Sequence, residues 1–127
     1  MDEDFIGDLF ASFGPVTVRR MFSGSGIFAD GLMFGLIVRD VIYLKVDGSN
    51  RADFEREGCK PLTYTRGRTS GRPSEHALPY WRLPERLYDD PDELAAWAKK
   101  AFAIAEHKKF AASSRTKRNR SGKAKRR

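Results

Sequence analysis

Three small residues near the start of the chain have the spacing of a phosphate-binding loop. Gly24, Gly26 and Ala29 fit the pattern G-x-G-x-x-[G/A], in which glycines let the backbone approach a dinucleotide pyrophosphate. That chemistry needs a strand that runs directly into a helix, because the helix N-terminus binds the phosphates. The segment that follows, IFADGLMFGLIV, has instead the pattern of strand, hairpin and strand. We therefore interpret the glycines as a bulge or bend between strand segments, where positive φ or close backbone approach is required.

Other residues with chemical potential form no recognisable constellation. His76, His107 and Cys59 lack the spacing of zinc ligands. Ser74, Glu75 and His76 are neighbours in one loop, whereas a catalytic triad is assembled in space. We interpret Cys59 as a small buried hydrophobe rather than a reactive thiolate. The sequence predicts no enzyme activity, with no catalytic residue, no metal site and no cofactor.

The positive charge of the chain is concentrated at its C-terminal end. The 127 residues carry a formal net charge of +7. Residues 111–127 contribute eight basic residues and no acidic one, which leaves 16 basic and 17 acidic residues in 1–110. A segment so charged and without aromatic residues is predicted to be disordered, and such arms bind polyanions through phosphate contacts or serve only solubility. The candidate nucleic-acid-binding residues are Arg115, Lys117, Arg118, Arg120, Lys123, Lys125, Arg126 and Arg127.

Two further groups of residues are candidates for a partner or anion site. Arg66, Arg68 and Arg72 lie among glycines in residues 65–74, which form either a solvated loop or an anion-binding one. Arg19 and Arg20 are adjacent, so on a strand they point to opposite faces and at most one enters a shared site. Of the two we single out Arg20.

Tyr80 and Trp81 complete the candidate partner site. They lie between two prolines and form either an aromatic interface patch or part of the core against the last helix. A homodimer through an edge strand is compatible with the sequence.

One cysteine, an acidic start and short apolar runs predict the compartment. A single cysteine forms no internal disulfide and fits a reducing environment. We expect no signal peptide and no membrane segment, and hence a cytoplasmic protein.

Hydrophobic periodicity and turn residues predict an α+β fold. Residues 5–13 place Phe5, Ile6 and Leu9 on one helical face. Strands are expected at 16–22, 32–38 and 41–46, because Asp30-Gly31 and Arg39-Asp40 are two-residue hairpin connections. A short helix capped by Ser49 or Asn50 ends at Gly58, and strands at 61–66 and 76–84 follow.

The last predicted element is a helix with a well-defined start. Asp90 is the expected N-cap, Pro91 the first helical residue, and order is expected to decay after Phe110 or Ala112. The predicted order is α-β-β-β-α-β-β-α, in two layers, with about five mostly antiparallel strands and helices packed on them. The predicted domain covers residues 1–110, and the basic tail covers 111–127.

Three stretches resemble the TfoX (Sxy) N-terminal domain family. They are RRMFSGSGIFADGLMFGLIVRDVIYLKVD, RADFEREGCKPLTY and YWRLPERLYDDPDELAAWAKKA, and together the resemblance spans about residues 5–105. Ser23, Phe28 and Leu62 depart from the residues usual in the family. No counterpart of the second domain of full-length members follows, so we expect a stand-alone N-terminal domain.

The resemblance implies a two-layer α+β domain similar to secretion chaperones. It also implies a regulator of transcription, because well-known members activate natural competence genes together with the cyclic-AMP receptor protein. The family implies no catalytic residue and no cofactor. We expect a regulatory domain whose body binds a protein partner, such as a transcription factor, and whose tail binds nucleic acid without sequence preference. The alternative is a protein-interaction adaptor without a nucleic-acid role.

Overall fold

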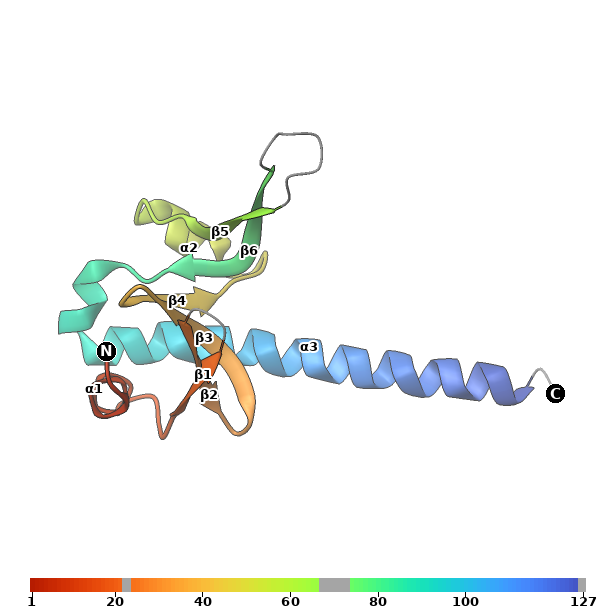
Figure 1. The fold of residues 1–127 in the computed structure, drawn as a ribbon. Helices are drawn as coiled ribbons and strands as arrows, with labels where there is room; N and C mark the ends of the chain where they lie inside the picture. The colour runs from red at the N-terminus through yellow and green to blue at the C-terminus, as the bar shows by residue number, and fades with distance from the viewer. Residues whose placement is uncertain (22–23, 67–73, 126–127) are drawn as a thin grey trace.

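Four strands follow one another in the first half of the chain. The computed structural model describes residues 1–21, 24–66 and 74–125 (Figure 1). Each of the first three strands pairs antiparallel with the next. They are β1 (Thr17–Met21), β2 (Gly24–Ala29), β3 (Leu32–Val38) and β4 (Val41–Lys45).

The two predicted hairpin turns are confirmed by their backbone angles. Asp30 and Gly31 have φ of 50° and 77° between β2 and β3. Arg39 and Asp40 have φ of 52° and 61° between β3 and β4. Positive φ at both central residues is the requirement of a type I′ turn, which matches the twist of the flanking strands.

Two more strands complete a six-stranded sheet. β5 (Pro61–Arg66) and β6 (Ser74–Arg82) pair antiparallel, and β6 also pairs with β4, so the order is β1-β2-β3-β4-β6-β5. The predicted α+β class and antiparallel sheet are confirmed. The sequence predicted about five strands, because the glycine segment was expected to bend. It pairs instead as a strand of its own, β2.

All three helices pack on one face of the sheet. They are α1 (Glu3–Leu9), α2 (Arg51–Arg56) and α3 (Pro91–Lys125), and a 3₁₀ helix, η1 (Glu85–Asp89), precedes α3. Phe34 of β3 is fully buried beneath them, with ring centroids 5.7 Å from Phe10 and 6.3 Å from Phe102. Ile6, Phe54 and Ala98 join the same cluster, so one core unites the helices with the sheet.

Two local expectations need correction. Phe5 was placed on the buried face of the first helix, but it is 45% exposed, because the buried stripe runs through Ile6, Leu9 and Phe10 and Phe5 lies at its edge. Asn50 precedes α2, but its side chain caps no helical N–H. It accepts a hydrogen bond from the Asp47 N–H and donates one to the Lys45 carbonyl, which ties the end of β4 to α2.

The start of α3 agrees with the predicted capping. The Asp90 side chain accepts a hydrogen bond from the Glu93 N–H at 3.2 Å, and Pro91 is the first helical residue. The helix then extends well past the sheet (Figure 1). The helical backbone continues to Lys125, and the decay of order expected after Phe110 or Ala112 stays a prediction. Alanine, lysine and arginine in this segment are good helix formers, which is compatible with that continuation.

Candidate functional site

The glycines of the apparent phosphate motif allow close approach of neighbouring groups. A Cβ on Gly24 would lie 2.3 Å from the carbonyl oxygen of Ile37. One on Gly26 would lie 2.8 Å from Met33 Sδ and 2.9 Å from Met21 Sδ. Neither glycine has positive φ, and β2 leads into a hairpin rather than a helix. Of the two structural requirements considered, close approach is therefore the one that applies.

The sheet face opposite the helices is a large apolar depression. We call it the open face, and its cavity volume is about 830 Å³. β1, β3, β4 and β6 contribute its main apolar side chains. These are Met21, Met33, Leu36, Val38, Tyr43 and Leu78.

Three basic side chains lie in or beside the open face. Arg39, in the β3–β4 turn, lines it directly. Lys45 Nζ lies 4.9 Å from the ring centroid of Tyr80, which also lines the depression. Burial lowers the pKa of Lys45, and the positive charge of Lys108 lowers it further. Arg19 stacks over Phe28, with the guanidinium carbon 5.1 Å from the ring centroid.

Arg19 and Arg20 point to opposite faces of β1, as the sequence predicts for adjacent strand residues. Arg19 pairs across the sheet with Gly26, so it shares the face of Met21 and Met33. Arg20 shares the face of Val18, which packs against the core on the helix side. The structure therefore puts Arg19, and not the singled-out Arg20, beside the open face.

Tyr80 and Trp81 separate in the same way. Tyr80 lines the open face and is only 6% exposed, and burial raises the pKa of its phenol. Trp81 packs against the core, with its ring centroid 6.3 Å from that of Phe54. The two adjacent aromatics thus divide between the two faces of β6 and do not form one patch.

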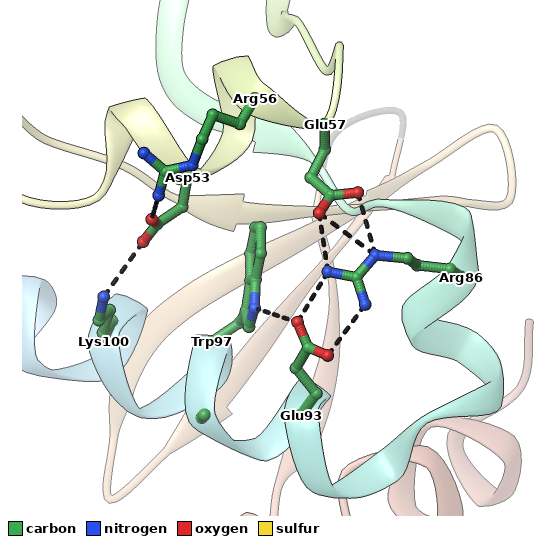
Figure 2. A pocket seen from close by; sticks show the side chains of 8 residues that line it. Asp53, Arg56, Glu57, Arg86, Glu93, Trp97 and Lys100 are labelled. Atoms are coloured by element: carbon green, nitrogen blue, oxygen red, sulfur yellow. Dashed lines mark hydrogen bonds and ion pairs between the residues drawn. The ribbon is translucent and has the colours of Figure 1, made fainter.

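A second cavity, of about 330 Å³, holds a network of ion pairs (Figure 2). Arg86 of η1 donates two hydrogen bonds to Glu93, at 2.9 and 2.7 Å, and its guanidinium also binds both oxygens of Glu57. Trp97 Nε1 donates to Glu93 at 3.3 Å. Asp53 pairs with Lys100 at 3.1 Å and with Arg56.

The charges of this second cavity satisfy one another. Hydrogen bonds from Arg86 lower the pKa of Glu57 and Glu93, and the two carboxylates raise the pKa of Arg86. Three carboxylates face three cations among the lining residues. A guanidinium already held by two carboxylates has little capacity for a further anion. We therefore assign the cluster to fastening α2 and η1 onto α3.

Cys59 does not have the features of a reactive thiolate. Cys59 is half-buried, and burial raises the pKa of its thiol, which favours the unreactive form. No group of three or more His, Cys, Asp or Glu residues suited to a metal occurs among the described residues.

In that same part of the chain, no helix is long and apolar enough to cross a membrane.

The remaining candidates are placed only in part. Arg66 ends β5, and Arg68 and Arg72 lie outside the described residues. The backbone of the basic segment from Arg115 to Lys125 belongs to α3, whereas Arg126 and Arg127 lie outside the described residues.

Sequence reasoning missed the open face, although a signal for it was present. LMFGLIV in β3 is apolar at both odd and even positions, and VIYL in β4 is too. A strand that is apolar on both faces indicates a sheet that is covered on both sides.

Comparison with known families supplies the identity. In a comparison with curated proteins, none matches this chain. The model of the TfoX N-terminal domain matches residues 8–105, which include all strands of the described residues and all of the buried core cluster except Ile6. With more than three quarters of its length in that match, the chain belongs to the TfoX N-terminal domain family.

Proposed function

We propose that this protein is a non-enzymatic regulatory domain whose body binds a protein partner and whose C-terminal segment binds nucleic acid. The observation that carries the nucleic-acid half is the separation of charge along the chain. Residues 1–110 are nearly neutral, whereas residues 111–127 carry eight basic residues and no acidic one. The described part of that segment continues α3 away from the sheet (Figure 1).

This arrangement suits contact with a phosphate backbone. The eight cations follow a near-neutral body in the sequence, so they can contact phosphates independently of it, and such contacts carry no sequence information. Competence regulation at promoters, which the family resemblance implies, is the setting in which we place this binding. Sequence preference would then come from a partner protein bound to the body.

A salt-dependent titration tests the nucleic-acid half. Full-length protein is titrated with a fluorescent duplex from about 50 to about 200 mM salt. We expect a slope of log K against log salt approaching roughly −7, from about 0.9 per neutralised phosphate. The test variant replaces all eight basic residues of 111–127 by glutamine. The control replaces Lys60, Arg51 and Lys99, three exposed cations of the body, by glutamine.

The two variants distinguish DNA binding through the C-terminal segment from DNA binding through the body. The tail variant is expected to lose most of its affinity and of its salt slope, and the body variant to keep both. If the tail variant binds DNA like the wild type, the nucleic-acid half is wrong. The chain would then be better described as a protein-interaction adaptor, an alternative that the apolar open face favours.

A further inference from the structure

No helix or strand of the described residues covers the open face. The helices pack on the opposite side, where Phe34 and Leu44 are fully buried. Leu36 and Tyr43 of the same two strands line the depression and are partly exposed. Exposed contiguous apolar surface with a polar rim is typical of interaction sites.

Two methionine side chains form a flexible part of the open face. Met21 of β1 and Met33 of β3 approach each other over Gly26, where a Cβ would be under 3.0 Å from both sulfurs. The missing side chain therefore creates room that the flexible thioethers share. Methionine adapts its shape to a bound partner more easily than branched residues do.

Cations, and no carboxylates, are found among the described residues that line the open face or stack on aromatic rings beside it. Arg39 lines it, and Lys45 and Arg19 stand over aromatic rings at its margins. In the described part of the chain none of these three cations is paired with a carboxylate. No acidic residue is present among the described residues that line the depression. A partner that buries its apolar side chains here would place its flanking residues beside unpaired cations.

We propose that the open face binds an acidic amphipathic segment of a partner protein. This inference rests on the proposed function and names the surface and the chemistry of its protein-binding half. Apolar side chains of the segment occupy the depression between Met33, Leu36 and Tyr43, and its carboxylates pair with Arg19, Arg39 and Lys45. Charge complementarity of this kind contributes to orientation and association rate, while the apolar anchors contribute most of the affinity.

A second copy of the chain is the competing occupant. Phe5, 45% exposed, lies on α1 between Asp4 and Asp8, so it too combines an apolar side chain with carboxylates. It offers one large side chain on a helix of seven residues, which is little for a depression of about 830 Å³. We therefore favour a partner segment with several anchors, as in helix-in-groove recognition.

The test selects peptides on the full-length protein without assuming their sequence. A displayed library of random 16-residue peptides is panned, and enriched peptides are measured by fluorescence anisotropy. We expect enrichment of sequences that combine Asp or Glu with Leu, Ile, Phe or Met at helical spacing. Absence of enrichment, or enrichment without acidic bias, overturns the proposal.

Charge reversals on the two faces of the sheet locate the binding. Arg19→Glu with Arg39→Glu changes the open face, and the matched control Arg20→Glu with Arg51→Glu makes the same change elsewhere. We expect roughly tenfold weaker peptide binding for the first pair and little change for the second. Leu36→Ala, which keeps all charges, is expected to weaken binding at least fivefold. Circular dichroism checks that each variant is folded.

Two outcomes would contradict the assignment in different ways. Equal loss in both charge-reversed variants, or none in either, places the peptide elsewhere and leaves the protein-binding function standing. Light scattering that shows self-association, abolished by Phe5→Ser and by Leu36→Ala alike, assigns the open face to a second copy. Neither outcome depends on the DNA titration, so the nucleic-acid half is judged separately.

Discussion

Replacing Gly24 by alanine tests whether the glycine motif serves close approach. The new Cβ would lie 2.3 Å from the carbonyl oxygen of Ile37 and 3.3 Å from Val38 Cγ2. Ordinary contact starts at 3.4 Å, so β2 or β3 has to move by about 1 Å. Because that oxygen belongs to the backbone of the adjacent strand, no side-chain rotation relieves the overlap. The displaced strand also carries hydrogen bonds of the central sheet.

We expect Gly24→Ala to lower the free energy of unfolding by about 3 kcal/mol, the upper end of the range for overpacked sites. Equilibrium unfolding in urea, followed by circular dichroism, measures this directly. With a denaturant slope of about 1.5 kcal/mol/M, the midpoint falls by about 2 M and the slope stays unchanged.

Alanine substitutions at two other glycines serve as controls for the effect of Gly24→Ala on stability. A Cβ on Gly48 meets nothing within 4 Å, so Gly48→Ala is expected to change stability by less than about 1 kcal/mol. Gly26→Ala meets the flexible ends of Met21 and Met33, and an intermediate loss of about 1 kcal/mol is expected. If Gly24→Ala and Gly48→Ala unfold at the same urea concentration, Gly24 is not required for close approach and the prediction is refuted.

Three further predictions concern the turns and the ion pairs. Arg39→Asn is expected to raise stability by about 1 kcal/mol, because asparagine tolerates the φ of 52° better than arginine, and a lower melting temperature would contradict this. Asn50→Ala is expected to lower the free energy of unfolding by about 1–3 kcal/mol in urea, because two hydrogen bonds of a side chain only 2% exposed are lost. Glu57 and Glu93 have lowered pKa values in the folded state, so their contribution is present above the ordinary carboxyl pKa of 4.5 and is lost as the pH falls through the folded values. Urea unfolding from about pH 7 to about pH 3 should therefore show falling stability, with a smaller fall in Arg86→Gln, and equal pH dependence in the two proteins would refute the pairing.

Local chemistry made much of the fold predictable from the sequence. Asp30-Gly31 indicated a type I′ turn because aspartate and glycine tolerate positive φ, and both angles are positive in the structure. Asp90 and Pro91 indicated the start of the last helix through capping and a preset φ, which act within one turn of the chain. The spacing of hairpins between helices then indicated an antiparallel α+β domain.

The candidate sites were less accessible because they depend on contacts distant in sequence. Arg86 binds Glu57, which is 29 residues away, and the sequence around either residue does not indicate this ion pair. The arginine that borders the open face is Arg19 and not Arg20, because the pairing of β1 with β2 decides which face each residue occupies.

The sequence alone therefore determined the turns, the helix start, the antiparallel class and the separation of charge between body and tail. These follow from backbone angles, capping and composition, which are properties of neighbouring residues. Only the tertiary structure decided that Gly24 is needed for close approach, that β6 lies between β4 and β5, and that an apolar depression forms opposite the helices. Those features depend on strand register and packing, in which side chains from distant segments first meet when the sheet assembles.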